Sequence, residues 1–299
     1  MNIIVIGANG LLGRHLVNNL SKDHFVYCFV NINSIIKFNI NDNVKVIKMD
    51  LNDFKIDILP KSIDTIFYLA QSNNYKNFPD RSNDIFNVNI NAPIEFIDWG
   101  RKNGVKNFIY TSSGGIYESS DLPLEESANI SFQERDLGFY ISTKFCAEIL
   151  LMNYSKFFKN LSIIRPFFIY GPGQKKSMLI SRLINSVKNG DKINLNGKNG
   201  ITLNPIYVSD AAKAIEKSIN LNEFNIINIA GFESLTIRDI CKKIAHFLDK
   251  EPNFDIKKEK GRNIIANIDK MKKLLISPST NFDKGIKKTI DFENTPSAK

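Results

Sequence analysis

Cysteine is scarce in this sequence: there are three copies among 299 residues, far apart along the chain. They are Cys28, Cys146 and Cys241. Proteins that depend on disulfides are dense in cysteine and show paired spacings, which this chain lacks. The sequence therefore argues against a disulfide framework and predicts a protein of a reducing compartment.

Long apolar runs are also missing. A membrane-spanning helix needs about 20 consecutive apolar residues, and no run in the chain approaches that length. The opening MNIIVIGANG has a short apolar run and no basic leader, so it does not resemble a signal peptide. We expect a cytoplasmic protein with no membrane contact.

Histidine is as rare as cysteine, and its three copies are His15, His24 and His246. No two of them have the spacing of metal ligands, and no Ser-His-Asp constellation can be argued from them. We expect no metal site, and we interpret the histidines as structural or surface residues.

The net charge is +9, from 40 basic and 31 acidic residues. The basic residues are scattered along the chain instead of forming a stripe, which is typical of a solvated surface. We expect no nucleic-acid partner. Salt-dependent binding to RNA would be the sign of one.

Short β-branched runs alternate with longer helical stretches along most of the chain. Strands are predicted at 3–6, 25–30, 44–48, 65–69, 108–111, 161–164 and 224–230, and helices at 11–20, 85–103, 140–158, 208–219 and 236–247. This alternation indicates βαβ units and a parallel sheet covered on both faces. The predicted fold class is α/β, a Rossmann-type doubly wound parallel sheet.

Three glycines follow the first predicted strand and precede the first helix. In IIVIGANGLLG the spacing Gly7, Gly10, Gly13 would allow a tight turn, a close approach to a pyrophosphate and close packing of helix on strand. The helix N-terminus adds free amides for phosphate. The alternative is a plain turn, but the position directly after a hydrophobic strand favours dinucleotide binding.

The type of dinucleotide stays open at this point. The end of the second strand normally provides an acid for the ribose hydroxyls, and this chain has Asn31 there. Asn31 would repel a 2′-phosphate less than Asp would, yet no arginine follows closely to hold one. Asp50 follows the third strand, where its side chain could reach the adenine amino group. NAD is the expected cofactor, and NADP is not excluded.

The regular pattern weakens after Pro172, and the segment 185–200, rich in Asn, Lys and Gly, is predicted to be surface. We expect an NAD(P)-binding Rossmann domain over 1–170, to which 203–230 returns. A smaller C-terminal substrate lobe is expected from 171–202 and 231–299.

Tyr140 and Lys144 lie four residues apart, which places them on one face of a helix. A lysine ammonium beside a phenol favours phenolate and lowers its pKa, so that Tyr140 could act as an acid and base. Ser113, at the end of a strand, could bind the oxygen of a substrate. The alternative is a chance surface pair, but no other tyrosine in the chain has lysine four residues on.

With these residues in view, the chain resembles the extended short-chain dehydrogenases/reductases of the NAD-dependent epimerase/dehydratase family. The resemblance covers nearly the whole chain and rests on the ordered motifs GANGLLG, MDL, YLA, NVNINA, NFIYTSSGGIY, YISTK, RPFFIYGPGQ and NPIYVSDAA. It implies that Ser113, Tyr140 and Lys144 are catalytic. The residues that it and the glycine motif place at the cofactor are Gly7, Asn9, Gly10, Leu11, Leu12, Gly13, Asn31, Asp50, Leu51, Leu69, Ala70, Gln71, Asn89, Tyr140, Lys144, Pro166 and Phe167.

The resemblance also implies a chemistry: hydride transfer on a nucleotide-activated sugar, with Tyr140 as acid and base. An epimerase is expected, and the alternatives are a 4-keto-sugar reductase or dehydrogenase and a non-catalytic cofactor-sensing Rossmann protein. Dehydratases of the family carry an Asp-Glu pair directly after the catalytic hydroxyl. This chain has Gly114 and Gly115 there, which disfavours dehydration. Many members pair through the Tyr–Lys helix and its neighbour, so a homodimer is expected.

Two stretches depart from the family pattern. Phe168 stands where many members have Asn, and Leu203-Asn204 replaces a common Arg-Asp pair whose arginine binds the sugar-nucleotide diphosphate. These departures affect the expected substrate more than the expected reaction. The cations that could take over are Arg182, Arg238 and Arg262.

Overall fold

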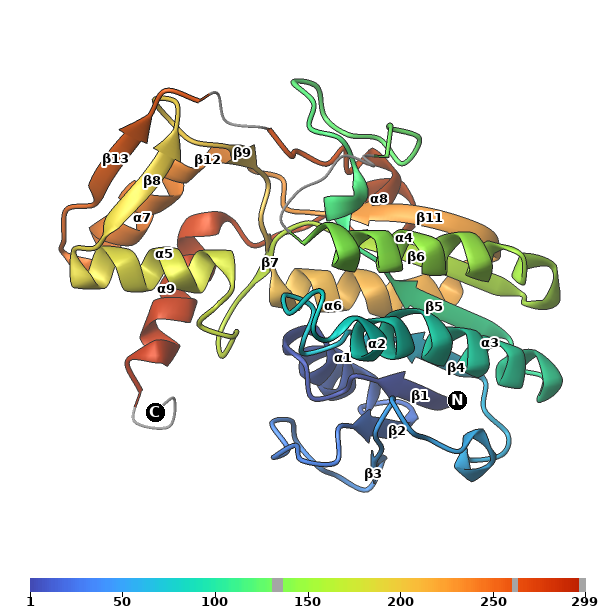
Figure 1. The fold of residues 1–299 in the computed structure, drawn as a ribbon. Coiled ribbons are helices and arrows are strands. Elements are labelled where there is room, and N and C mark those ends of the chain that lie inside the picture. The colour runs from blue at the N-terminus through green and yellow to red at the C-terminus, as the bar shows by residue number, and fades with distance from the viewer. Residues whose placement is uncertain (131–136, 260–262, 296–299) are drawn as a thin grey trace.

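A computed structural model describes residues 1–130, 137–259 and 263–295. Its centre is a seven-stranded sheet with the strand order β11-β6-β5-β4-β1-β2-β3 (Figure 1). Every neighbouring pair is parallel. The strands are β1 (Asn2–Ile6), β2 (Phe25–Val30), β3 (Val44–Lys48), β4 (Thr65–Tyr68), β5 (Asn107–Thr111), β6 (Asn160–Pro166) and β11 (Glu223–Ile229). The predicted Rossmann-type α/β fold is confirmed.

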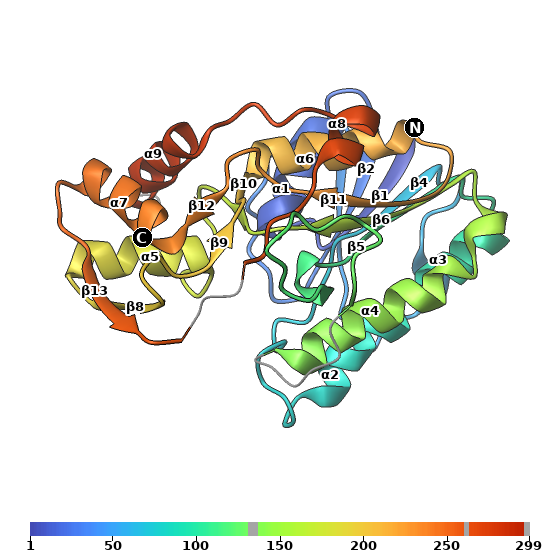
Figure 2. The same ribbon diagram turned by 90° about the horizontal axis from the view of Figure 1, so that it is seen from above.

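Helices cover both faces of this sheet. On one face lie α1 (Leu11–Leu20) and α6 (Val208–Lys217), and on the other lie α3 (Ala92–Lys102) and α4 (Gly138–Met152) (Figure 2). A parallel sheet enclosed in this way needs strands that are apolar on both sides, which is why its strands appear as continuous hydrophobic runs.

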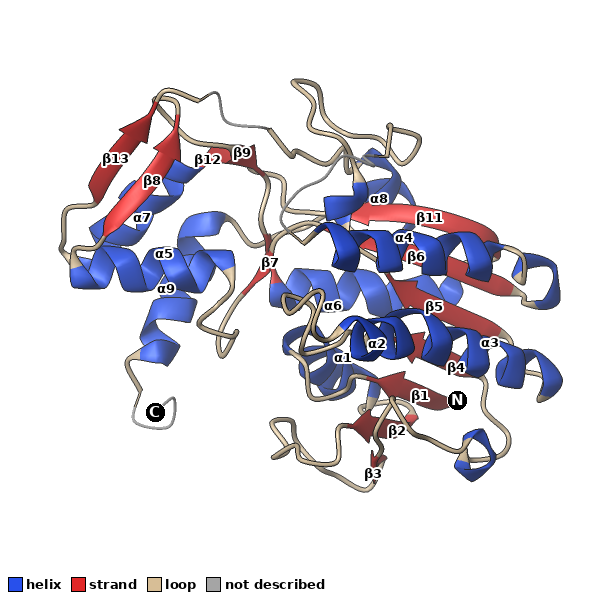
Figure 3. Cartoon of the chain, viewed as in Figure 1, coloured by secondary structure: helices blue, strands red, loops and turns tan. Residues whose placement is uncertain are grey.

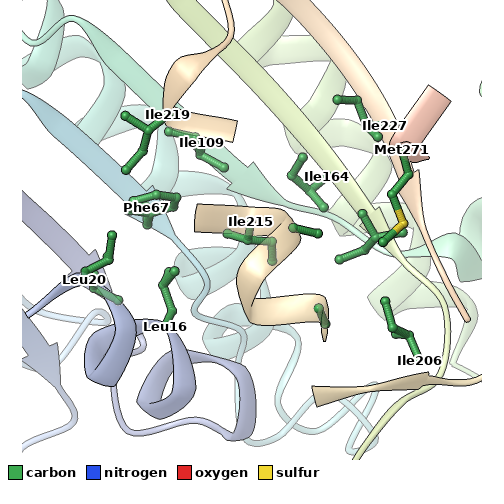
Figure 4. Close-up of a cluster of buried hydrophobic side chains, with 14 of the residues drawn as sticks. Leu16, Leu20, Phe67, Ile109, Ile164, Ile206, Ile215, Ile219, Ile227 and Met271 are labelled. Atoms are coloured by element: carbon green, nitrogen blue, oxygen red, sulfur yellow. The ribbon is translucent and has the colours of Figure 1, made fainter. Parts of the chain in front are cut away.

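The core divides along the pleat of the strands. In β1, Ile3 and Val5 pack towards α1 and α6, whereas Ile4 and Ile6 pack towards Phe96 of α3. Successive strand residues point to opposite faces, so one strand serves two cores. Figure 4 shows part of the core on the α1–α6 side of the sheet, including Leu16, Leu20, Phe67, Ile109, Ile164 and Ile215.

The helices beside β4 and β5 differ in detail from the prediction. The helix predicted at 85–103 begins earlier, with α2 (Ser82–Phe86), and passes through a π-helical turn at Asn87–Asn91 before α3. The helix predicted at 140–158 ends at Met152, and a short 3₁₀ turn at Ser155–Phe157 follows. Single π-helical turns inside helices often mark functional sites.

A smaller lobe lies to one side of the sheet and has its own hydrophobic cluster (Figure 3). Its helices are α5 (Leu179–Asn189), α7 (Ile237–Leu248) and α9 (Phe282–Glu293), and its parallel strands are β8 (Lys192–Asn196) and β13 (Asn253–Lys257). Short strand pairs lie where the chain passes between the two parts: β7 (Ile169–Tyr170) with β10 (Ile206–Tyr207), and β9 (Thr202–Leu203) with β12 (Leu235–Thr236).

The prediction that 185–200 is surface is wrong. This segment includes the last turn of α5 and all of β8, and Val187, Ile193 and Leu195 are buried in the cluster of the smaller lobe. The Asn- and Lys-rich composition hid a strand whose alternate residues are apolar, KINLN, with an outer face that is polar.

The assignment of all of 231–299 to the smaller lobe also needs correction. The segment that contains α8 (Asp269–Leu274) packs against β11, and Ala266, Ile268 and Met271 belong to the core on the α1–α6 side of the sheet. The chain then returns to the smaller lobe with α9. The division into two lobes is otherwise kept as a proposal.

Candidate active site

The predicted cofactor turn lies between β1 and α1. Gly7 has φ +85°, and a Cβ there would lie 2.8 Å from the backbone nitrogen of Ala70. A Cβ on Gly13 would lie 2.3 Å from the carbonyl oxygen of Gly7. No acidic residue occupies the first turn of α1. The turn therefore requires glycine, and the helix N-terminus behind it favours an anion.

Both polar atoms of the Asn9 side chain are hydrogen-bonded to the loop after β2. Its Nδ2 donates to the carbonyl of Ile35 and its Oδ1 accepts from the amide of Lys37, both at 2.8 Å. Asn31 is exposed at the end of β2, and its Oδ1 accepts from the amide of Asn33 at 3.1 Å. The side chain of Asn9 thus fastens the loop after β2 to the glycine turn.

The other predicted cofactor residues follow the carboxyl ends of their strands. Asp50 comes after β3, and its Oδ1 accepts from both the backbone and the side-chain amide of Asn52, at 3.0 and 3.1 Å. Its neighbour is Leu51, while Leu69 and Ala70 directly follow β4, and Leu11 and Leu12 begin α1. In an open parallel sheet, ligands bind at this edge.

Two groups meet at the hydroxyl of Tyr140. It donates to Oε1 of Gln71 at 3.0 Å, and the hydroxyl of Ser113 forms a hydrogen bond to it. The Oγ of Ser113 also accepts from the amide of Gly115 at 3.0 Å. The structure therefore brings Ser113 and Tyr140 together as predicted from the sequence, although their catalytic roles remain a proposal.

Lys144 lies one turn further along α4, with 2 % of its surface exposed. Its Nζ donates to the carbonyls of Thr111 and Ala70, at 2.9 and 3.4 Å, and lies 4.9 Å from the ring centroid of Tyr110. Burial lowers the pKa of Lys144 to about 7, and the carboxylate of Glu148 opposes that shift. At neutral pH its ammonium is therefore close to titration.

The pKa of Tyr140 shifts in the direction opposite to the one expected from the sequence. Burial raises it above its ordinary value, Tyr75 adds to the rise, and the hydrogen bond from Ser113 lowers it. The expected net lowering is not found in this structure, because the loss of water around the phenol outweighs the hydrogen bond from Ser113.

Asn89 connects the loop after β4 to α4. It lies in the π-helical turn, has no exposed surface, and accepts from the amide of Ser72 at 3.0 Å. Its Nδ2 donates to Oγ1 of Thr143 at 3.0 Å, and that hydroxyl donates to the carbonyl of Tyr140 at 2.7 Å. Asn89 thus holds the backbone at Ser72 directly and the backbone at Tyr140 through Thr143. Neither Ser72 nor Thr143 was predicted as a site residue, although Thr143 lies within the motif YISTK.

A buried ion pair that sequence reasoning missed lies beyond Lys144. Arg165 donates to both carboxylate oxygens of Glu148, at 2.6 and 3.1 Å, and both side chains are almost fully buried. Arg165 also donates to the hydroxyl of Tyr117 at 2.5 Å, which in turn donates to Asn228 at 2.8 Å. The only signal in the sequence was a glutamate four residues after Lys144, on the same helical face.

The end of β6 leads into an unusual backbone. Pro166 ends the strand, and the ring of Phe167 is buried against Gly114 and stacks with Tyr117 at 5.9 Å between centroids. Phe168 has φ +46°, in the left-handed region that bulky residues rarely adopt. Backbone strain of this kind is concentrated at functional sites.

The loop after β4 and the segment before α5 meet beside Tyr140. The ring of Tyr75 lies 5.2 Å from that of Tyr140, and its hydroxyl is 3.9 Å from Sδ of Met178. Lys175 donates to Oδ1 of Asn73 at 2.8 Å. The loop after β4 is therefore tied to the segment that precedes α5 in the smaller lobe.

The residues that replace the family's Arg-Asp pair serve the fold. Leu203 is fully buried and pairs with Leu235. Asn204 accepts from the amide of Ala266 and donates to the carbonyls of Ala266 and Gly231, at 3.0 to 3.2 Å. Neither side chain is available to a diphosphate.

The three arginines expected as replacements have different surroundings. Arg238 donates to the carbonyl of Lys198 at 2.7 Å and lies 4.4 Å from the ring centroid of Phe254. Arg182 is exposed on α5. Arg262 lies outside the described residues. Of the two that the structure describes, Arg182 is the better candidate, because Arg238 is already engaged.

Neither a metal site nor a membrane-spanning helix is found in the part of the chain that the structure describes. No group of three or more His, Cys, Asp or Glu side chains there is arranged to hold a metal ion. No helix among the described residues combines the length and the apolar character needed to cross a membrane.

Comparison with known proteins places these features in context. The model of the NAD dependent epimerase/dehydratase family matches residues 3–230. The chain is 25 % identical to a trifunctional UDP-glucose 4,6-dehydratase/UDP-4-keto-6-deoxy-D-glucose 3,5-epimerase/UDP-4-keto-L-rhamnose-reductase of Arabidopsis thaliana, over 97 % of this chain and 46 % of that protein. It thus spans about half the length of this relative.

Two shorter proteins match along their whole length. A putative UDP-glucose 4-epimerase of Methanocaldococcus jannaschii is 24 % identical, with 97 % of each chain covered. UDP-glucuronic acid 4-epimerase from Bacillus cereus, known from a crystal structure in complex with NAD, is 22 % identical in sequence. Its structure matches with a TM-score of 0.85 over 100 % of this chain and 99 % of that one. The second likeness shows that the two chains share a fold.

Proposed function

The chain belongs to the NAD dependent epimerase/dehydratase family, and from this premise we propose that it is an NAD-dependent epimerase of a nucleotide-activated sugar. The observation that carries the proposal is the meeting of Ser113 and Tyr140 at the carboxyl edge of the sheet, with Lys144 one turn along. The relatives named as UDP-sugar epimerases support the substrate class. A 4-keto-sugar reductase is the second candidate. A protein that only senses the cofactor would not need the hydroxyl pair.

The glycine turn fits the cofactor. Backbone atoms occupy the space that a Cβ on Gly7 or Gly13 would need. The turn can therefore bring its own backbone amides close to a bound ligand. The N-terminus of α1 would hold the pyrophosphate of NAD, and Asp50 would lie towards the adenine. When bound, NAD accepts a hydride from the sugar carbon and returns it.

The catalytic step is assigned to Tyr140. As the carbon loses hydride, the ionised form of Tyr140 takes the proton of the sugar hydroxyl, and the resulting phenol returns it when the ketone is reduced. Ser113 donates a hydrogen bond that fixes this oxygen. Lys144 lies one turn from Tyr140 on the same helical face, where a charged ammonium would stabilise the phenolate and could hold the cofactor ribose.

Dehydration is disfavoured by the space beside Ser113. A Cβ on Gly114 would lie 2.4 Å from the ring of Phe167, and one on Gly115 would lie 2.7 Å from Cδ1 of Ile141. An acid side chain could occupy neither position without moving the core. The crowding at Gly114 and Gly115 supports an activity without elimination of water, although several relatives carry a dehydratase activity in their names.

We further propose that the protein is a homodimer that pairs through α4. The outer face of this helix carries three large apolar side chains that are two-fifths or more exposed: Ile149, Leu150 and Met152. Apolar groups clustered on one helix face are typical of an interface.

The function is tested by incubating the protein with NAD and a panel of nucleotide sugars while nicotinamide absorbance is followed. Conversion of one sugar into its epimer without a net change in absorbance is the expected result. Net oxidation or reduction would favour the reductase, and the absence of any conversion would favour a sensor. Tyr140→Phe should abolish conversion and leave NAD binding nearly unchanged. An active Tyr140→Phe variant would disprove the assigned role.

A further inference from the structure

We infer that Gln71 is a positioning residue for Tyr140: its side-chain amide accepts the hydrogen bond of the phenol and thereby fixes the orientation of the Tyr140 hydroxyl. The inference rests on the proposed function, because it concerns the same hydroxyl. The sequence places Gln71 only among the residues that line the cofactor. The structure adds a direct contact with the reacting atom.

The contact defines the geometry of the phenol. The hydroxyl of Tyr140 has one proton, and it donates that proton to Oε1 of Gln71 at 3.0 Å. The same oxygen takes part in the hydrogen bond with Ser113. The O–H bond therefore points to Gln71, and Tyr140 has to lose this proton before its oxygen can accept one from a sugar hydroxyl.

The backbone beneath Gln71 is held on both sides. Ala70 lies under the glycine turn, within contact of Gly7, and the amide of Ser72 donates to the buried Asn89. The hydroxyl of Ser72 also donates to Asp84. The side chain of Gln71 is exposed, yet it extends from a backbone with little freedom to move. Its amide is therefore presented to Tyr140 in a repeatable position.

The carbonyl oxygen of an amide accepts a hydrogen bond from a neutral phenol. A carboxylate at the same place would accept with a full negative charge, and an alkyl group could not accept at all. In the arrangement observed, the amide stabilises the neutral phenol, so it contributes to a raised pKa.

Other ionisable groups surround the same phenol and have to be kept unchanged in a test. Lys144 is next along α4, Tyr75 faces it from the loop after β4, and the buried Tyr110 of β5 interacts with it. Substitution of Gln71 alters none of these side chains. A change in the pH dependence can therefore be traced to the amide.

The test compares Gln71→Leu and Gln71→Glu by the pH dependence of kcat in the NAD-loaded enzyme. Gln71→Leu removes the acceptor, so the limb that rises with ionisation of Tyr140 should move to lower pH by about half a unit to one unit. Gln71→Glu offers a charged acceptor, so the same limb should move to higher pH by about one unit or more. KM for the sugar should change less than kcat. A purely structural role would not move the two variants in opposite directions.

Asn77 provides a matched control, because it is an exposed amide in the same loop. Asn77→Leu and Asn77→Asp should leave the profile in place. A second readout is the NMR signal of labelled tyrosine ring carbons, with Tyr140 assigned by its loss in Tyr140→Phe. The midpoint of that signal should shift in the same directions without any turnover.

The outcomes separate the two proposals. If Tyr140→Phe stays active, the proposed function fails. If Tyr140→Phe is inactive while both Gln71 variants keep the parent profile and the parent NMR midpoint, only the role of Gln71 is overturned. Shifts of both variants in one direction would also overturn it.

Discussion

The side-chain amide of Asn89 donates to the hydroxyl of Thr143 at 3.0 Å, and both side chains are buried. The two residues come from different helices, and Thr143 lies directly before Lys144. The other end of the Asn89 amide holds the backbone next to Gln71. One buried side chain therefore sets the spacing between the loop after β4 and the helix that carries the proposed catalytic pair.

Asn89→Ala should lower kcat by about tenfold or more and also lower the melting temperature. The loss follows because the amide of Ser72 and the hydroxyl of Thr143 are left without their buried partner, at a cost of about 1–3 kcal/mol each. Steady-state kinetics and a thermal melt measure the two effects. Asn91→Ala, an exposed change two residues away, should alter neither. Parent-like kinetics in Asn89→Ala would show that the spacing is held by other contacts.

Lys144 should make stability depend on pH in the alkaline range. Its pKa is about 7 in the folded chain and 10.5 for the free side chain, so the unfolded chain binds more protons between these values and stability rises with pH there. The destabilisation is complete below about pH 7 and fades as pH approaches 10.5. Lys144→Met should therefore gain free energy of unfolding over the parent, more at about pH 6 than at about pH 9. Urea denaturation at both pH values measures the difference, and an equal gain at both would contradict the lowered pKa.

Gly114→Ala should lower the melting temperature, because its Cβ would overlap the ring of Phe167. Gly138→Ala is the matched control, since nothing lies within 4 Å of a Cβ at that position and α4 begins there. That change should be neutral or slightly stabilising. If both alanines melt like the parent, the site has room for a side chain, and the case against dehydration weakens.

Glu148→Gln should reduce the free energy of unfolding by about 3–5 kcal/mol, because it leaves the guanidinium of Arg165 buried without its counter-ion. Asp291→Asn breaks an exposed pair with Lys287 and should cost less than about 1 kcal/mol. Urea titrations of the two variants give the comparison. Similar small losses in both would mean that water reaches Arg165.

Leu150→Glu should convert a dimer into a monomer, since a charge would be buried at the proposed interface on α4. Ile256→Glu, which places the same charge on an exposed apolar position of β13, should not. Light scattering after size exclusion, at several protein concentrations, gives the masses. A parent protein that is monomeric throughout would disprove the pairing.

The sheet could be predicted from the sequence because its strands are buried on both faces, so that runs such as IIVI and FVYCFV stand out whatever surrounds them. The smaller lobe was predicted only in part: the helix predicted at 236–247 matches α7, but β8 alternates apolar with polar residues, and the Asn- and Lys-rich segment 185–200 covers the end of α5. The motifs predicted Ser113, Tyr140 and Lys144. They could not predict that Gln71 meets Tyr140, because the two residues are 69 positions apart and only packing of the loop on α4 joins them.

The position of β11 has a consequence for synthesis on the ribosome. This strand completes the sheet by pairing along the whole of β6, yet it begins at Glu223, after the first part of the smaller lobe has been made. Until then β6 is an edge with unpaired amides and carbonyls and with apolar side chains such as Ile163 and Ile164, which is a template for pairing with other chains. A nascent chain that pauses before β11 is translated therefore presents an aggregation-prone edge, and slow translation of α5 and β8 prolongs that exposure.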